Sequence, residues 1–308
     1  MRPLIIIVGG GIAGLTAAAR CVSWQVPILL VEQQQRLGGQ LWWINNKIRD
    51  YPGVEANTGS EFCLQVLSQI HLPREHILLN QQVTRFLAGS EHRLVLCDGR
   101  ELTAPVVIAA TGASRRIPVI PGISDVDHDR VSMSATTDRE LAAGEAAAVV
   151  GGGDGAAENA IILARRSKHV HLICRSTELR ARRPFREAIL NTDNISLHLS
   201  ATVREVFQNK LGLVLRIDTL NGLSELVVAG VVFKLGFVPN SQGWTPPVQT
   251  NPRGFIVANQ NGKTNVPGLF AAGDVNNESS PSIAAAVGQG AIAAHSAYKY
   301  LRHLGYDV

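Results

Sequence analysis

The feature that most constrains the fold of this 308-residue chain is a glycine-rich turn that occurs twice. The first copy, Gly9-Gly10-Gly11-Ile12-Ala13-Gly14, follows the apolar run Leu4–Val8 and precedes an Ala-rich helical pattern over Leu15–Arg20. Another apolar run, Pro27–Val31, comes next. Because two parallel strands need a crossover helix between them, this segment predicts a β-α-β unit.

The second copy lies about 140 residues later and has the same order of parts. Gly151-Gly152-Gly153-Asp154-Gly155-Ala156 follows Ala146–Val150, precedes a helical pattern over Glu158–Arg166 and leads to the apolar run His169–Ile173. A chain of this length is too long for one small core. We therefore predict an α/β fold of two Rossmann-like dinucleotide-binding domains, each of three ββα layers.

The remaining patterns place the domain boundaries. Strands are predicted at Arg93–Cys97, Val106–Ala110, Gly230–Leu235 and Leu269–Ala272, and a long helix at Ile283–Leu301. Proline-containing segments at 115–122 and 243–253 predict links between the domains. We expect one domain from residues 1–114 and 244–308, with the second domain, residues 115–243, inserted between them.

The first turn predicts a dinucleotide site. A diphosphate must approach backbone N–H groups at a helix N-terminus, so this turn requires residues without a Cβ. Glu32 comes after the next strand, where a carboxylate binds ribose hydroxyls and disfavours a 2′-phosphate. FAD and NAD fit this pattern, and NADP does not.

Two further segments favour FAD over NAD. Gly38-Gly39-Gln40 lies just beyond Glu32, and Ala272-Gly273-Asp274 lies near the other end of the chain, before the helix that begins at Ile283. Asp274 is suited to accept a hydrogen bond from a ribityl hydroxyl. The N-terminus of that helix would place partial positive charge near the flavin pyrimidine and stabilise the anionic reduced ring.

Taken together, the motifs resemble those of low-molecular-weight thioredoxin reductases, in the same order and over essentially the whole chain. The resemblance implies a two-lobe, FAD-containing homodimer of the flavin disulfide reductase class, with Asp50 at the flavin edge and backbone contacts from Val83 to adenine. The segments that carry it are Gly9–Gly14, Gly38-Gly39-Gln40, Asp50-Tyr51-Pro52-Gly53, Ala110-Thr111-Gly112-Ala113, Gly151–Ala156, Gly236–Asn240 and Ala271–Asp274.

The motifs and the resemblance give one set of expected cofactor-binding residues. These are Gly9, Gly11, Ile12, Ala13, Gly14, Glu32, Gln33, Gly39, Gln40, Asp50, Val83, Ala110, Thr111, Gly112, Gly153, Asp154, Gly155, Arg175, Arg180, Gly236, Gly273, Asp274, Ser282 and Ile283.

The chain departs from the family pattern at three places. Ser134 and Thr137 stand where the family carries its CxxC pair, and because hydroxyls cannot form a disulfide no catalytic residue is assigned. The His-Arg-Arg signature for the NADPH 2′-phosphate becomes Cys174-Arg175-Ser176, with Arg180 retained. The usual Arg-Gln-Ala before the last helix becomes Pro281-Ser282-Ile283.

These departures leave the ligand of the second turn open. The sequence fits three possibilities: NAD(P)H, a second FAD, or no ligand. A second FAD is what resemblance to cyanobacterial diflavin-linked disulfide oxidoreductases would imply. The favoured function is an FAD-dependent oxidoreductase that exchanges electrons between FAD and the second dinucleotide, with a thiol/disulfide couple as one candidate partner. Alternatives are a ferredoxin–NADP reductase or low-molecular-weight disulfide reductase of the same fold, and a non-catalytic flavin-binding sensor.

Composition limits the partners. The net charge of +4 and an aromatic content of 5% argue against nucleic-acid binding, and no apolar run reaches the roughly 20 residues of a membrane span. The arginines between 175 and 186 fit either a solvated helix face or a dock for an acidic ferredoxin. The cysteines, Cys21, Cys63, Cys97 and Cys174, have neither redox-pair nor metal-site spacing, so we expect no metal and a reducing, cytoplasmic setting.

Overall fold

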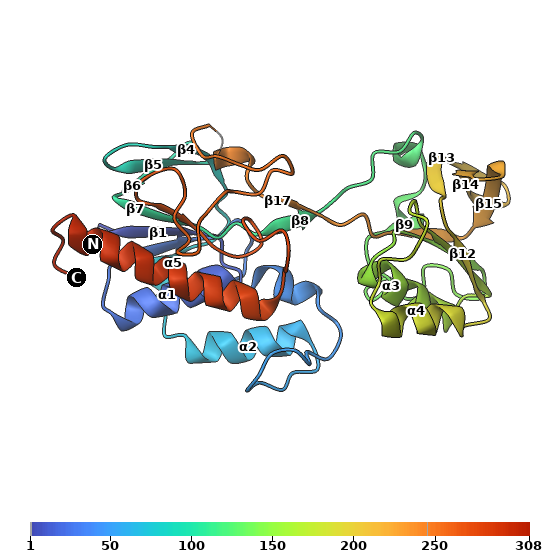
Figure 1. The fold of residues 1–308 in the computed structure, drawn as a ribbon, viewed down its shortest axis with the longest axis horizontal. Helices are drawn as coiled ribbons and strands as arrows, with labels where there is room; N and C mark the ends of the chain where they lie inside the picture. The colour runs from blue at the N-terminus through green and yellow to red at the C-terminus, as the bar shows by residue number, and fades with distance from the viewer. Residues whose placement is uncertain (1, 245) are drawn as a thin grey trace. The chain divides into compact units, whose positions relative to one another are not determined.

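The computed structural model describes residues 2–244 and 246–308 (Figure 1). Residues 1 and 245 lie outside the described residues, and with them one position of the predicted link 243–253. The chain divides into two compact units: unit 1 is Met1–Ser114 with Val238–Val308, and unit 2 is Arg115–Phe237. The chain passes from one unit to the other after Ser114 and again after Phe237. Both points lie in the two-stranded sheet of β8 (Ala113–Arg115) and β17 (Phe237–Pro239).

Unit 1 is built on a parallel sheet with the strand order β18-β7-β1-β2-β3. Helices α1 and α5 lie side by side on one face of this sheet, and an antiparallel sheet covers the other face (Figure 1). Its elements are β1 (Ile5–Val8), α1 (Ile12–Ser23), β2 (Ile28–Val31), η1 (Gly39–Trp43), α2 (Gly59–Gln69), η2 (Arg74–His76), β3 (Ile77–Leu78), β4 (Val83–Leu87), β5 (His92–Leu96), β6 (Glu101–Ala104), β7 (Val106–Ala109), η5 (Gln242–Trp244), β18 (Leu269–Ala271) and α5 (Ile283–His303).

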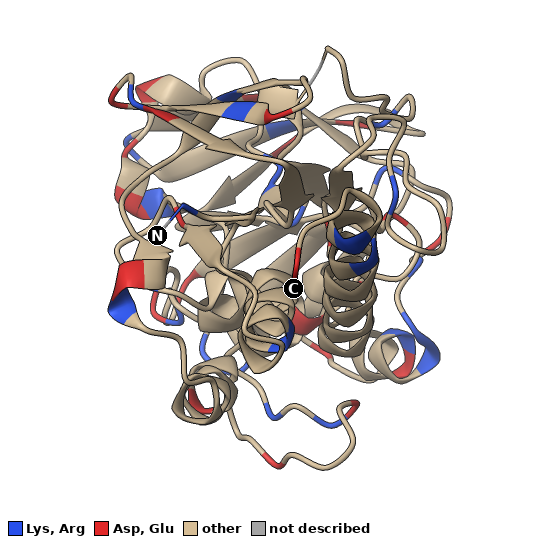
Figure 2. Cartoon of the chain, turned by 90° about the vertical axis from the view of Figure 1, so that its left-hand side faces the viewer, with Lys and Arg blue, Asp and Glu red and all other residues tan. Residues whose placement is uncertain are grey.

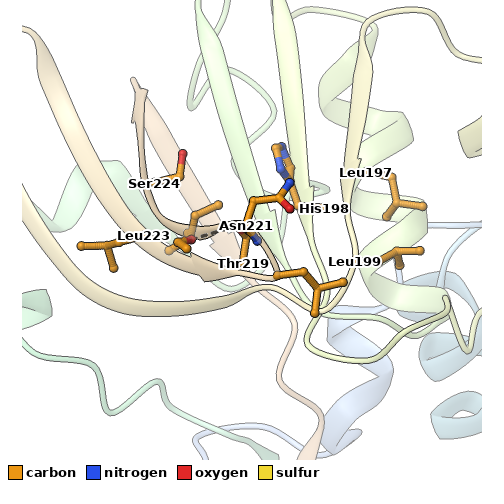
Figure 3. A pocket seen from close by; sticks show the side chains of 10 residues that line it. Leu197, His198, Leu199, Thr219, Asn221, Leu223 and Ser224 are labelled. Carbon is orange, nitrogen blue, oxygen red and sulfur yellow. Dashed lines mark hydrogen bonds between the residues drawn. The ribbon is translucent and has the colours of Figure 1, made fainter.

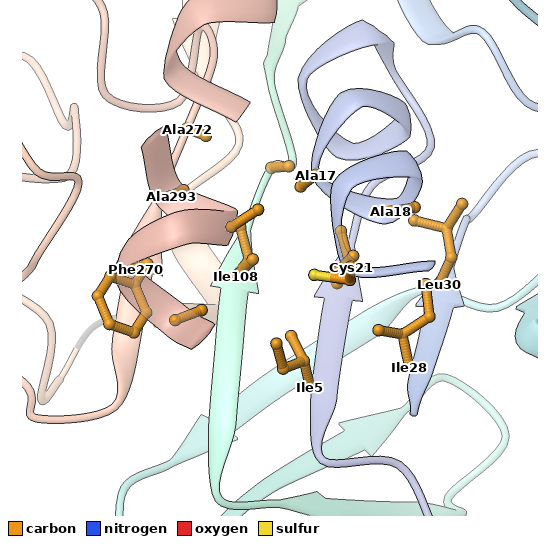
Figure 4. Packing of buried hydrophobic residues seen from close by; sticks show 14 of the residues in the cluster. Ile5, Ala17, Ala18, Cys21, Ile28, Leu30, Ile108, Phe270, Ala272 and Ala293 are labelled. Atoms are coloured by element: carbon orange, nitrogen blue, oxygen red, sulfur yellow. The ribbon is translucent and has the colours of Figure 1, made fainter. Parts of the chain in front are cut away.

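Small residues allow α1 and α5 to pack closely. A Cβ built on Gly290 of α5 would lie 2.3 Å from the carbonyl oxygen of Ala13 in α1, so no larger residue fits there. Figure 4 shows Ala17 and Ala18 of α1 above the branched side chains of the sheet, with Cys21 among them. The N-terminus of α1 is thereby held close to the strand ends.

Unit 2 repeats this plan with the strand order β12-β11-β10-β16-β9, all parallel. Helices α3 and α4 contribute to the core on one face, and an antiparallel β13-β14-β15 sheet packs on the other. Its elements are η3 (Ile123–Asp125), η4 (His128–Arg130), β9 (Val131–Ser132), β10 (Ala146–Val150), α3 (Asp154–Ala164), β11 (His169–Ile173), α4 (Arg183–Leu190), β12 (Ile195–His198), β13 (Thr202–Asn209), β14 (Gly212–Thr219), β15 (Gly222–Val228) and β16 (Gly230–Phe233).

The predicted fold class is confirmed, with shifts at the element ends. Both helices after the glycine turns begin earlier than the apolar pattern suggested, at Ile12 and Asp154, because the turn residues themselves adopt helical geometry. Cys97, predicted within a strand, lies in the turn after β5. Of the first predicted link, 115–122, which the structure describes in full, only Arg115 belongs to a strand, as the last residue of β8, and the two prolines that follow lack a donor for sheet pairing.

Residues 238–243 belong to unit 1 in the structure, whereas the sequence placed them in the inserted domain. The Asn240 N–H donates to the Gly112 carbonyl at 2.9 Å, and Ser241 Oγ donates to the Gly254 carbonyl at 2.6 Å. Trp244, directly after them, is buried in the core of unit 1. These contacts join residues far apart in the sequence.

Among the described residues, no helix combines the length and apolar character that crossing a bilayer requires. The same residues bring together no group of three His, Cys, Asp or Glu side chains suited to a metal ion. Basic and acidic residues are interspersed along the ribbon (Figure 2), in keeping with the small net charge of +4.

Candidate nucleotide-binding sites

The first glycine turn is sterically closed to side chains at its ends. A Cβ built on Gly14 would lie 1.9 Å from the Gly9 carbonyl oxygen. A Cβ on Gly9, whose φ is +109°, would lie 2.2 Å from the Ala110 carbonyl oxygen. The absence of these two Cβ atoms lets α1 begin directly against the ends of β1 and β7.

The N-terminus of α1 is open at the turn. Gly11 is the N-cap, and no described side chain accepts a hydrogen bond from the first backbone N–H groups there. A Cβ built on Gly11 would have no described atom within 4 Å. The turn at Ile12, Ala13 and Gly14 therefore offers uncapped donors and partial positive charge, which a diphosphate fits.

Glu32 is fixed beside this turn. It is buried, its Oε2 accepts from the Gly10 N–H at 2.6 Å, and its Oε1 accepts from the Gln34 N–H at 2.8 Å. Gln33, which lies between Glu32 and Gln34 in the sequence, is exposed. The carboxylate thus occupies the end of β2 where the sequence predicted a ribose contact.

The tertiary structure brings three distant predicted segments together. A Cβ on Gly39 would lie 3.1 Å from Gly11 Cα, so the 38–40 loop lies against the first turn. Gln40 Nε2 donates to Asp274 Oδ2 at 2.8 Å. Burial raises the pKa of Asp274, and the hydrogen bond from Gln40 partly offsets this rise.

Gln289 is a residue that the sequence analysis missed. Its Oε1 accepts from the Gly273 N–H at 2.8 Å, which fixes the strand-to-loop turn that carries Asp274. It lies in the first third of α5, within an Ala-rich helical pattern. Its position as a polar residue in that pattern was the available signal.

The segment 110–112 is held at the end of β7. The Ala110 N–H donates to the Val8 carbonyl at 2.8 Å, beside the first turn. Thr111 Oγ1 donates to the Asn240 carbonyl at 2.8 Å, and the Asn240 N–H returns a bond to Gly112. The segment is therefore part of the same strand-end region as Gly9.

Two other expected cofactor residues lie in unit 1, outside the glycine turn. Asp50 is exposed in the loop between Ile48 and Ala56, which pair in an isolated bridge. Val83 begins β4, two residues after Gln81, whose N–H donates to the Glu32 carbonyl at 3.0 Å.

Near the C-terminus, Ser282 is the N-cap of α5 and accepts from the Ala285 N–H at 3.2 Å, with Ile283 as the first helical residue. Gly236 lies in unit 2, exposed, with a φ of +87°.

The second turn, in unit 2, has the same open end. Gly153 is the N-cap of α3 without a side-chain cap, and a Cβ on it would meet no described atom within 4 Å. Gly155 lies in the first turn of α3. Asp154 Oδ1 accepts from the Arg182 N–H at 2.7 Å, and the two side chains form an ion pair. The geometry fits a diphosphate here as well.

Arg175 and Arg180 flank this turn and are both exposed. The Arg180 N–H donates to the Gly152 carbonyl at 2.8 Å, so its loop is tied to the turn. The other arginines of the cluster contact unit 2 itself: Arg182 pairs with Asp154, Arg183 with Glu187, and Arg186 donates to the Ala181 carbonyl.

The loop that holds Ser134 and Thr137 comes directly after β9. Ser134 is buried, and its Oγ lies 2.6 Å from Thr136 Oγ1. The Ala135 N–H donates to Asn159 Oδ1 of α3 at 2.6 Å. Thr137 is exposed.

The four cysteines, all within the described residues, are free thiols. Burial raises the pKa of Cys21 to about 12, with Arg20 opposing the rise, and burial also raises the pKa of Cys63. A thiol is a nucleophile only as its thiolate, so burial suppresses the reactivity of both.

Unit 2 also has an open hollow of about 520 Å³ between the end of β12 and the β14–β15 hairpin (Figure 3). Leu197, His198 and Leu199 line one side, and residues 219–224 line the other. None of the residues that line it is among the predicted nucleotide-binding residues.

Comparison with known proteins identifies the family. The family model described as "Pyridine nucleotide-disulphide oxidoreductase" matches residues 3–290. The chain belongs to this family. It is a flavoprotein oxidoreductase of the thioredoxin reductase-like class, which confirms the enzyme class predicted from the motifs.

Individual relatives are similar to this chain over nearly the whole length of both. The thioredoxin reductase of Bacillus subtilis is 30% identical over 97% of this chain and 95% of its own, and that of Treponema pallidum is 33% identical over 96% of each. The crystal structure of thioredoxin reductase from Lactococcus lactis is similar with a TM-score of 0.87 and 27% identity, covering 98% of this chain and 100% of that one.

Proposed function

We propose that this chain binds FAD at the first glycine turn and exchanges electrons between that flavin and a dinucleotide bound at the second turn. The observation that carries the proposal is that both α1 and α3 begin at an N-cap glycine with uncapped N–H groups and open space before them. Two such termini in one chain suit two diphosphates. Glu32 beside the first turn and Asp274 joined to Gln40 support FAD there.

The second ligand is NAD(P)H or a second FAD. Charge at the end of the second strand of each unit is opposite in sign: Glu32 lies after β2, whereas Arg175 lies after β11. A carboxylate disfavours a phosphate on the ribose, whereas a guanidinium accepts one. Arg175, together with Arg180, whose N–H donates to the Gly152 carbonyl of the turn, supports an anion at this end of the second site.

Electron transfer in this proposal does not use a disulfide at positions 134 and 137. These positions hold hydroxyl side chains, with Ser134 bonded to Thr136. The redox step is then a two-electron exchange between the reduced nucleotide and the flavin. A disulfide outside the chain, which two electrons and two protons convert to two thiols, or another oxidant completes the cycle. We further propose that the protein works as a homodimer in the cytoplasm.

The cofactor content of the purified protein tests the first part. Denaturation, chromatography and mass spectrometry of the released nucleotides should give at least one FAD per chain. Two FAD molecules per chain would identify the second ligand as a flavin, and one would leave NAD(P)H. A colourless protein that does not take up added FAD would contradict the proposal.

The donor is tested by anaerobic stopped-flow reduction of the bound flavin. NADPH, NADH and reduced ferredoxin are mixed separately with the oxidised protein. Reduction by a pyridine nucleotide supports electron entry through the second site, and reduction by ferredoxin alone favours the ferredoxin-linked alternative. If none of them reduces the flavin, the enzymatic proposal fails in favour of a flavin-binding sensor.

A further inference from the structure

Two cations converge on one backbone carbonyl in unit 2, at the carboxyl ends of neighbouring strands. Lys234 lies directly after β16, and Met133 lies directly after β9. Lys234 Nζ donates to the Met133 carbonyl at 3.3 Å, and Arg115 Nη1 donates to the same carbonyl at 3.4 Å. The nucleotide motifs of the sequence include neither cation.

Lys234 lies against the second glycine turn itself. A Cβ on Gly155 would lie 3.1 Å from Lys234 Cε and 3.9 Å from Nζ, and a Cβ on Gly151 would lie 2.5 Å from the Lys234 carbonyl. The Lys234 N–H donates to the Val150 carbonyl at 2.8 Å. The ammonium is therefore next to the start of α3, where a diphosphate would enter.

The strand order places Lys234 and Arg175 on opposite sides of the second turn. In the order β12-β11-β10-β16-β9, the turn lies after β10, Arg175 after the neighbouring β11, and Lys234 after β16 on the opposite side. A dinucleotide in such a fold crosses the carboxyl ends of the strands, with its adenosine half near the second strand of the unit. A redox ring at its other end would then lie toward β16 and β9, on the side of the turn that carries Lys234.

Both cations are partly buried, and each has a carboxylate near it. Burial lowers the pKa of Lys234, and the neighbouring Arg115 lowers it further, while Glu158 raises it. Burial raises the pKa of Glu158, and Lys234 partly offsets this rise. Asp154 is paired with Arg182. Burial lowers the pKa of Arg115, whereas Asp138, which accepts from Ser132 Oγ, raises it.

We propose that Lys234 and Arg115 set the charge selectivity of the second site, favouring a redox ring that is neutral or anionic over one that is cationic. The inference rests on the proposed binding of a dinucleotide at this turn. The ring of NAD(P)⁺ carries a positive charge, whereas the rings of NAD(P)H and oxidised FAD are neutral and that of fully reduced FAD is an anion. Like charges in a partly buried site repel, so oxidised nicotinamide is the disfavoured ligand.

Binding measurements on the purified flavoprotein test this selectivity. Dissociation constants for NADP⁺ and NADPH are measured anaerobically by calorimetry, with NAD⁺ and NADH as a second pair. The wild-type protein should bind the reduced form more tightly, and Lys234→Met should reduce this preference by about tenfold. That is the effect of one unit charge about 6 Å from the ring at an effective dielectric constant of about 40, between the values for a protein surface and for water.

Two variants control for a general loss of binding. Lys234→Arg keeps the charge and should keep the preference, and Lys210→Met makes the same change at an exposed position in the turn between β13 and β14 and should change nothing. If Lys234→Met does not fold, Arg115→Gln provides the same test at the second cation.

A protein purified with two flavins is tested by potentiometry instead. The midpoint potential of the second flavin should then become more negative in Lys234→Met, because loss of the cation disfavours the anionic reduced ring. An unchanged preference or an unchanged potential overturns the selectivity proposal alone. If the wild type binds no dinucleotide at this turn, the proposed function of the second site fails with it.

Discussion

The two glycine turns occupy the same place in their units but differ at the last residue of the G-x-G-x-x-G pattern. In unit 1 this position is Gly14, where an added Cβ would lie 1.9 Å from the Gly9 carbonyl oxygen. In unit 2 it is Ala156, whose methyl group is buried beside Gly151. The second turn is thus wide enough for a methyl between helix and strand, and the first is not. The same motif in sequence therefore gives two different tolerances in structure.

The units also differ in the residues that lie after the second strand. Unit 1 places a buried carboxylate, Glu32, in two hydrogen bonds to the backbone of its turn region. Unit 2 places a buried thiol, Cys174, behind its turn, with Arg175 exposed beyond it. The carboxylate of Glu32 accepts hydrogen bonds beside the first turn, whereas the small thiol of Cys174 packs against the second. The nucleotide preferences of the two units are expected to differ accordingly.

A substitution at Gly14, the last glycine of the first turn, is expected to have the largest effect on stability. Gly14→Ala should destabilise unit 1 by about 4 kcal/mol, since a methyl overlapping a backbone oxygen forces α1 away from the strands. Bound flavin should be lost with it. Thermal unfolding and the visible absorbance of the flavin measure both effects.

The reciprocal change serves as the control. Ala156→Gly in unit 2 should cost about 1 kcal/mol, the difference in helix propensity between the two residues. Retention of flavin and thermal stability in Gly14→Ala would show that the first turn is no tighter than the second.

Glu32 gives the next largest effect. Glu32→Gln should cost about 2 kcal/mol, because the amide group cannot accept hydrogen bonds at both of its ends and one buried N–H loses its acceptor. Denaturant unfolding measures the change, and FAD titration of the apoprotein should show weaker binding.

Glu55→Gln, at an exposed position of the same unit, should leave both measurements unchanged. Wild-type stability in Glu32→Gln would mean that the two backbone bonds contribute nothing net to the turn.

The smallest effect concerns pH and unit 2. His171 Nδ1 lies 3.0 Å from His198 Nε2, and burial, with His198 and His169 beside it, lowers the pKa of His171 to about 4. The unfolded chain takes up this proton near pH 6.5 and the folded chain only near pH 4, so the free energy of unfolding falls as the pH falls through this interval.

His171→Gln should reduce this dependence, with a difference in the melting temperature of about 2–4 °C at a pH of about 4.5. His303→Gln, at an exposed site near the end of α5, should retain the wild-type dependence. Identical pH profiles for wild type and His171→Gln would contradict the assignment.

Much of the candidate site could be predicted because its signals are local. The residues of both turns, and Glu32 after the second strand, are specified by spacing within about 25 residues along the chain. A strand, a turn and a helix of fixed rise leave little freedom over that length. The positions of Asp50 and Val83 relative to a flavin, which rest on resemblance, stay predictions.

The sequence by itself determined that the chain has two β-α-β units, that each glycine turn leads a helix, and that positions 134 and 137 hold hydroxyl groups. Only the tertiary structure decided that Gln40 meets Asp274, that residues 238–243 join unit 1, and that Lys234 and Arg115 converge on Met133. The physical reason is strand order. Hydrogen-bond register between strands sets which ends lie side by side, and that pairing depends on packing between segments that no local pattern relates.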